Sequence, residues 1–135
     1  MKNAARLKTL AVLAVIATLV GGCSREPSRV DMDIPSGGAA LQAWADKAAE
    51  DNGVKGDYSA SSMAPTICQD LIPKNEDLTQ VAIELGKWRS VRVWDTSALL
   101  AIAIYGYCPQ YKSRWESNPT FKNSKVRGVT PIFVK

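Results

Sequence analysis

The 135-residue chain contains no histidine. Serine–histidine–aspartate and cysteine–histidine catalysis are therefore excluded, and so is every metal site that needs an imidazole ligand. No serine is followed three positions later by lysine, and Gly86–Lys87 lacks the flanking residues of a phosphate-binding loop. These absences favour a protein that is not an enzyme and that needs no cofactor or metal.

Carboxylates occur in neighbouring pairs, but their positions do not favour catalysis. The pairs are Glu50/Asp51, Glu76/Asp77 and Asp31/Asp33. A glycosidase needs two carboxylates across a cleft, with the pKa of one raised by burial. All three pairs fall at expected helix ends or in a polar segment, where we expect exposure.

Long apolar runs are also missing. The longest covers residues 9–20, which is about 12 residues, and a helix needs about 20 to cross a bilayer. Lys2, Arg6 and Lys8 precede this run, and small residues follow it. A basic start, a short apolar run and a small-residue exit are typical of a secretory signal peptide.

Val20, Gly21, Gly22 and Cys23 end this segment, and together they resemble the lipobox of bacterial lipoproteins. The resemblance implies transfer of diacylglycerol to the Cys23 sulfur, cleavage after Gly22 and acylation of the new amino terminus. The alternative is an unlipidated secreted protein in which Cys23 is incidental. Ser24 in place of aspartate resembles the rule for outer-membrane sorting, so we expect anchoring at the extracytoplasmic face of the cell membrane, or at the outer membrane if the host has one.

The net charge of +4 depends partly on the signal segment. From Cys23 onward the chain has 14 basic and 13 acidic side chains, which gives no reason to expect nucleic-acid binding. Residues 109–135 nevertheless hold six basic groups and one acidic group. They either contact anionic headgroups or an acidic partner, or they form a solvated tail, and the second reading is the simpler.

Two cysteines, Cys68 and Cys108, remain after Cys23. Cysteines in an exported chain usually pair, and the wide spacing and missing histidines argue against a redox motif or a metal site. We therefore expect a structural disulfide between them. Closing a loop of about 41 residues contributes roughly 4 kcal/mol in the chain-entropy description.

The apolar periodicity predicts a mainly α fold of about four helices. We expect helices at 39–52, at 64–72, from Asn75 or Asp77 onward, and from Asp95 or Thr96 to Cys108. The last is apolar on every side, so it is expected to be central and buried. Residues 89–94 read equally well as a short strand or a linker. The expected divisions are a signal peptide (1–22), a lipidated tether (23–38), a disulfide-stapled helical domain (39–112) and a basic irregular extension (113–135).

Large aromatic residues in so small a helical domain more often fill the core than line a groove for glycan or peptide. Two of them have charged neighbours and are exceptions. The predicted binding surface is therefore Tyr111, Lys112, Arg114 and Trp115.

The order of motifs resembles one group of short helical secreted proteins. Cys68 is followed by Asp70–Leu71, a later helix begins at Asp95–Thr96, and the series ends at Tyr107–Cys108–Pro109. This resembles a family of unknown function from mycobacteria and their phages, over about residues 39–112. The resemblance implies a compact helical domain with bonded cysteines and no particular activity, and it leaves the basic extension unexplained.

The sequence thus predicts a lipid-anchored, non-enzymatic binding protein of the cell envelope, with the membrane and an envelope or phage protein as partners. One alternative is a phage-encoded surface lipoprotein that excludes other phages. An accessory subunit of a secretion or cell-wall complex and, less favoured, a small envelope enzyme are the others.

Overall fold

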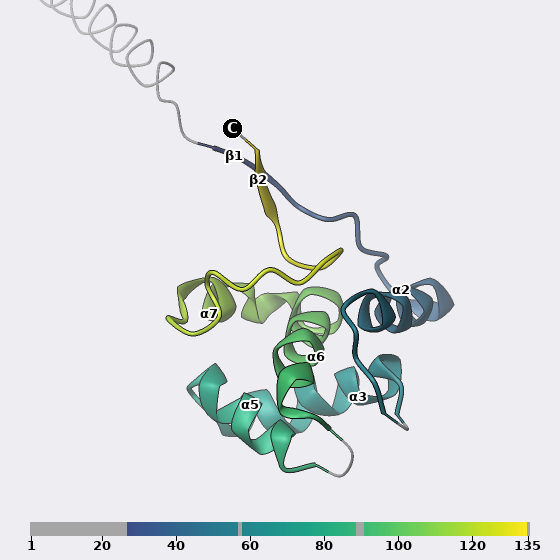
Figure 1. Ribbon diagram of the computed structural model, residues 1–135, viewed down its shortest axis with the longest axis vertical. Coiled ribbons are helices and arrows are strands. Elements are labelled where there is room, and N and C mark those ends of the chain that lie inside the picture. Colours follow the sequence, from purple (N-terminus) through teal and green to yellow (C-terminus); the bar gives the residue numbers. More distant parts are fainter. Residues whose placement is uncertain (1–26, 57, 89–90, 135) are drawn as a thin grey trace, which may run out of the picture. The chain divides into compact units, whose positions relative to one another are not determined.

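The computed structural model describes residues 27–56, 58–88 and 91–134 (Figure 1). Asp31–Ile132 form one compact helical unit, and the strands near the two ends form a separate unit. Cys23 and the expected signal peptide, 1–22, lie outside the described residues. The mainly helical fold and its disulfide confirm the predicted fold class.

The helices in chain order are α2 (Gly38–Asp51), α3 (Ala60–Thr66), α4 (Ile72–Lys74), α5 (Leu78–Gly86), α6 (Thr96–Ile102) and α7 (Lys112–Ser117). Two π-helical turns, η1 (Ile67–Leu71) and η3 (Ala103–Tyr107), and two 3-10 turns, η2 (Val93–Asp95) and η4 (Pro109–Tyr111), extend or join them. The strands are β1 (Ser28–Val30) and β2 (Ile132–Val134).

Hydroxyl and carboxylate caps set where two helices begin. The Ser59 hydroxyl accepts a hydrogen bond from the Ser62 amide at 3.2 Å, so α3 starts earlier than the predicted residue 64. The Asp77 carboxylate accepts one from the Thr79 amide at 2.9 Å, which confirms Asp77 as a start of the third helix. A short side chain that satisfies an unpaired amide fixes the first turn in both cases.

Both π turns end two residues before a proline. The amide of Ile72 donates to the Ile67 carbonyl ahead of Pro73, and the amide of Cys108 donates to the Ala103 carbonyl ahead of Pro109. Proline has no amide proton and its ring crowds the carbonyl four residues earlier. The five-residue step widens the helix where each proline must be accommodated, so helix α3 continues through η1 into α4 instead of ending near residue 72.

Helix α6 is the central element, as predicted. Figure 1 shows it among α2, α3, α5 and α7, and Ala98–Ile104 are all buried. Small residues alternate with leucine and isoleucine here, which lets surrounding helices approach on several sides. The apolar side chains of α2, α3 and α5 complete the same core cluster.

The disulfide between Cys68 and Cys108 joins η1 to the residue that follows η3, with the α-carbons 5.9 Å apart. This confirms the predicted pairing. Both sulfurs lie 3.4 Å from the Ala103 carbonyl oxygen. The bond therefore links η1 to the carboxyl-terminal end of η3.

The prediction that 113–135 is an irregular extension outside the domain is wrong. Helix α7 begins at Lys112, and Trp115 stacks on Phe121 with ring centroids 4.7 Å apart and planes 16° apart. Val126 and Val129 are buried in the same cluster as α6. Most charged residues of this segment are exposed, while a few widely spaced apolar side chains complete the core.

A side-chain amide fixes this segment to the end of α2. Asn52 donates to the Arg127 carbonyl and accepts from the Arg127 amide, both at 2.9 Å. The Thr130 hydroxyl accepts from the Val126 amide at 2.9 Å and closes the following turn. The carboxyl-terminal part of the helical unit is therefore held by defined hydrogen bonds as well as by burial.

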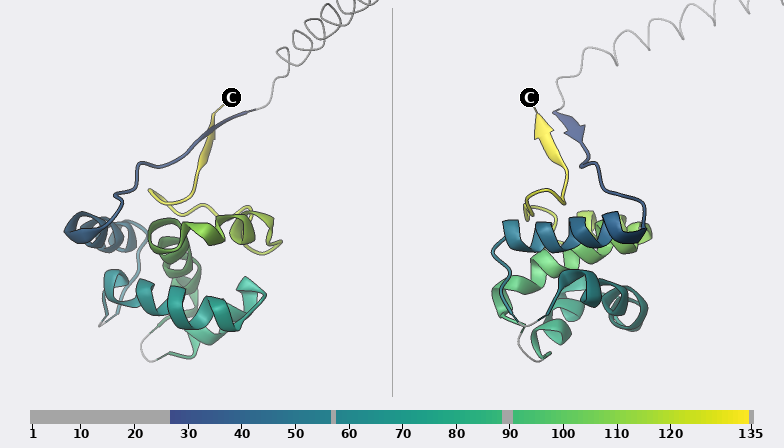
Figure 2. Two further views of the ribbon diagram at one scale, coloured as in Figure 1. Left: turned by 180° about the vertical axis from the view of Figure 1, so that it is seen from behind. Right: turned by 90° about the vertical axis from the view of Figure 1, so that its right-hand side faces the viewer.

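The predicted tether, 23–38, is only partly extended chain. Ser28–Val30 pair with β2 in a two-stranded sheet whose arrows run in opposite directions (Figure 2). Ile34 packs against the core of the helical unit, and α2 begins at Gly38. The long flexible tether of the prediction therefore contains a strand and a packed residue.

Candidate interaction surface

The structure buries the residue that the sequence made central to a binding surface. Trp115 is 2% exposed and stacks against Phe121. Its placement on an exposed surface was therefore a wrong prediction. Its charged neighbours, Lys112, Arg114 and Glu116, keep partial or full exposure while the indole is buried.

The remaining residues of that predicted surface are partly buried and support the fold. Arg114 donates to the carbonyls of Asn75, at 2.6 Å, and Glu76, which follow α4. Its guanidinium lies 5.5 Å from the ring centre of Tyr111. The Lys112 ammonium lies 5.3 Å from the Tyr105 ring. These cations are occupied by carbonyls and aromatic faces, which makes them poor candidates for recognising a partner.

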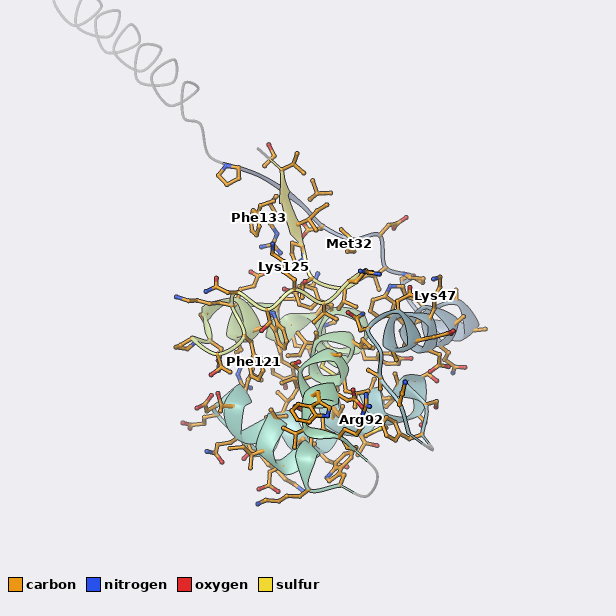
Figure 3. The ribbon with its side chains drawn as sticks, viewed as in Figure 1. Met32, Lys47, Arg92, Phe121, Lys125 and Phe133 are labelled. Atoms are coloured by element: carbon orange, nitrogen blue, oxygen red, sulfur yellow. A yellow bond between two sulfur atoms is a disulfide. The ribbon has the colours of Figure 1, made fainter. Side chains whose placement is uncertain are left out.

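An apolar groove instead runs beside α5. Its cavity volume is about 420 Å³, and its lining combines apolar side chains with three threonines and one charged residue, Lys87. The lining residues are Thr79, Ala82, Ile83, Gly86, Lys87, Val93, Thr96, Thr120 and Phe121. Figure 3 shows Phe121 between α7 and α5, where the aromatic edge of the core reaches the groove.

Two consecutive apolar residues, the first of which lines this groove, are largely exposed. Val93, which lines it, is 71% exposed, and the next residue, Trp94, is 79% exposed. Ile83, on α5, is 47% exposed. Contiguous exposed apolar surface beside a groove is typical of an interaction site, and tryptophan is the residue most enriched where interfaces gain their binding energy.

The turn that carries Val93 and Trp94 is held on both sides by one ion pair. Asp95 is 3% exposed and accepts from Arg92 Nε at 2.8 Å and from Arg92 Nη2 at 2.9 Å. Arg92 also donates to the Gly53 carbonyl at 2.8 Å. Since the two members of the pair flank Val93 and Trp94, the turn cannot fold inward without breaking a bidentate contact.

The same pair shifts two pKa values in opposite directions. Hydrogen bonds from the Arg92 guanidinium lower the pKa of the Asp95 carboxyl, and the Asp95 carboxylate raises the pKa of Arg92. Desolvation raises the pKa of Tyr58, and the nearby Asp95 charge adds to this shift. All three groups therefore keep their usual charge states at neutral pH, and the turn keeps its shape.

The described residues show little that indicates a catalytic or metal-binding site. The six carboxylates of the three sequence pairs are exposed, as expected, and Asp77 is used as a helix cap. In the described ranges no three acidic or cysteine side chains gather in a way that could hold a metal ion. A polar hollow near Arg114 and a smaller one near Lys47 hold about 380 and 260 Å³.

The sequence analysis missed Val93 and Trp94 because residues 89–94 were read as a short strand or linker. The available signal was the polar spacing: Arg92 and Asp95 stand three residues apart around two large apolar residues. Here the Asp95 member of the pair is buried, and the two residues between the members are exposed.

Across the described part of the chain, every helix is too short or too polar to cross a membrane. Comparison with family models, with curated proteins and with solved structures found no match to this chain. The resemblance to the mycobacterial and phage family stays a prediction.

Proposed function

We propose that this protein is a non-enzymatic lipoprotein of the bacterial cell envelope. In this proposal, lipid on Cys23 holds it at the extracytoplasmic face of a membrane, and the helical domain binds another envelope protein. The binding surface is the groove beside α5 together with Val93 and Trp94. This replaces the surface around Trp115 that the sequence suggested.

Two features support the anchor. Val20–Cys23 has the lipobox pattern, and the Cys68–Cys108 disulfide suits an oxidising compartment outside the cytoplasm. Cys23→Ala is expected to move the protein from the membrane fraction to the soluble fraction or to block its processing. Retention of a fully processed Cys23→Ala protein in membranes would rule out the lipid anchor.

The observation that carries the binding function is the exposure of Trp94 on a braced turn. Exposing most of a tryptophan to water forfeits the burial of roughly 200 Å² of apolar surface. The Arg92–Asp95 pair maintains this exposure, so the side chain is pre-organised for contact. A partner that places an apolar side chain in the groove would cover Val93 and Ile83, and Trp94 follows Val93 directly in the chain.

Photo-crosslinking in intact cells tests this surface. A crosslinking residue at Val93, which leaves the Trp94 ring in place, is expected to give a discrete protein adduct, whereas one at Lys47, exposed on α2, is the matched control. The proposal fails if neither site gives an adduct or if Lys47 gives the same one. Repeating the experiment during phage challenge distinguishes a resident envelope partner from an incoming phage protein.

A point substitution provides the second arm. Trp94→Ala removes the exposed ring while leaving the core untouched, so it is expected to abolish the adduct from a crosslinker placed at Ile83. Asp95→Asn, which loosens the turn, is expected to weaken the same adduct. If the yield of the Ile83 adduct were unchanged in the Trp94→Ala protein, Trp94 would not belong to the interface that includes the groove.

A further inference from the structure

Exposed apolar side chains are concentrated on the two strands. Of the seven large apolar residues that are exposed in the described part of the chain, four belong to β1 and β2. They are Val30 at 41%, Ile132 at 51%, Phe133 at 64% and Val134 at 51% exposed. A two-stranded ribbon with this composition is unstable in water without a covering surface.

The pattern of exposure indicates what kind of surface covers these apolar side chains. Successive side chains of a strand point to opposite faces, so Phe133 lies on one face of the ribbon and Val134 on the other. Both are more than half exposed. A second protein or a second copy of this chain would cover one face, whereas the interfacial layer of a bilayer surrounds both.

The short segment between Cys23 and β1 indicates where that surface lies. Four residues separate Cys23 from Ser28, the first residue of β1, so the two α-carbons are five residue steps apart. Fully extended, this segment spans about 18 Å at most. Since β2 pairs with β1, lipid on Cys23 would hold Phe133 and Val134 close to the headgroups of the membrane in which it is embedded.

We propose that the β1–β2 ribbon is a second membrane contact, which inserts Phe133 and Val134 into the interfacial layer of that membrane. The inference rests on the proposed lipid anchor at Cys23. An aromatic ring next to aliphatic side chains suits the boundary between headgroups and acyl chains. The contact is intramolecular once the chain is anchored, so three or four apolar side chains suffice for an interaction that would be weak in the free protein.

A chemically anchored protein tests the contact without relying on the cell to attach the lipid. The processed chain, Cys23 to Lys135, holds every described residue, and Cys23 is its one free thiol when Cys68 and Cys108 are bonded. Coupling this thiol to a maleimide phospholipid places the protein on phosphatidylcholine vesicles. Phe133→Trp and Val134→Trp then report on the two faces of the ribbon, and Ile83→Trp on α5 is the matched control.

The readout is the emission that each added tryptophan contributes beyond the unsubstituted protein, with and without brominated phosphatidylcholine. We expect Phe133→Trp and Val134→Trp to shift to shorter wavelength on anchoring and to be quenched by bromine, and Ile83→Trp to be unaffected. Quenching at only one of the two strand positions, or at neither, would overturn the inference. Burial against a second copy would also overturn it, since that gives the wavelength shift without bromine quenching.

Failure here and failure of the lipid anchor are distinguishable. If cells do not attach lipid to Cys23, the fractionation of Cys23→Ala shows it, while the vesicle experiment still reports on the ribbon. If cells do attach lipid but neither strand is quenched, the anchor stands and the second contact is removed.

Discussion

The burial of Trp115 gives the sharpest prediction about the fold. At 2% exposure, its side chain removes roughly 200 Å² from water, and at about 25 cal/mol per Å² this contributes about 5 kcal/mol. Alanine keeps a small part of that area, and the lost stacking on Phe121 adds to the cost. We therefore expect Trp115→Ala to lower the free energy of unfolding by about 3–5 kcal/mol.

Trp94 provides the matched control, because the same substitution there removes a ring that is 79% exposed. Only about one-fifth of its area is buried, so Trp94→Ala should cost about 1 kcal/mol or less. Urea unfolding followed by far-ultraviolet circular dichroism measures both variants without depending on tryptophan emission. For a domain of this size, Trp115→Ala should also lower the melting temperature by about 15–30 °C.

The reasoning would be refuted if Trp115→Ala lay within about 1 kcal/mol of the unsubstituted protein, or if the two variants were equally destabilised. Either result would place Trp115, on α7, outside the core. A destabilised Trp115→Ala protein with an intact disulfide would confirm that α7 is part of the domain.

Three further results are expected. The pKa of Asp95 is lowered in the folded state by its arginine partner, so its contribution is present above about pH 4 and disappears as the pH falls through the lowered pKa. In the Asp95→Asn protein the melting temperature should therefore fall less steeply as the pH is lowered into the acidic range. The same dependence of melting temperature on pH in both proteins would contradict this. Reducing the Cys68–Cys108 bond should cost roughly 4 kcal/mol in urea unfolding, with no free thiol titrated beforehand in a chain that lacks Cys23. Asn52→Ala should cost about 1–3 kcal/mol and speed proteolysis near Arg127, because two backbone groups lose their partner; unchanged proteolysis would show that the segment is held by burial alone.

Helices with strong caps or uniform apolar character could be predicted from the sequence. Asp77 was identified as a cap, and the run from Ala98 to Ile104 was identified as the buried central helix. The disulfide followed from the small number of cysteines. These features depend on local chemistry, so they can be read without knowing what packs against them.

The role of the last part of the chain could not be predicted in the same way. Trp115, Phe121, Val126 and Val129 are separated by irregular spacings and surrounded by basic residues, so no helical or strand period marks them as core. Their burial depends on an open edge of the α5–α6 core that exists only after the other helices have packed. Trp94 is the opposite case. Composition alone assigns this aromatic residue to the core, but the Arg92–Asp95 pair holds its turn so that the ring is exposed.

Residues near the carboxyl end complete the core, and this also constrains the order in which the chain can fold and form its disulfide. A chain emerges from the ribosome amino end first, so α6 stays without its full covering until the segment through Val129 has emerged. In the exported lipoprotein that we propose, Cys68 would meet an oxidant before Cys108, and Cys23 would be the other thiol available to it. In the lipoprotein that we propose, acylation of Cys23 removes this wrong partner early. The lipid would then protect the native cysteine pairing as well as retain the finished protein.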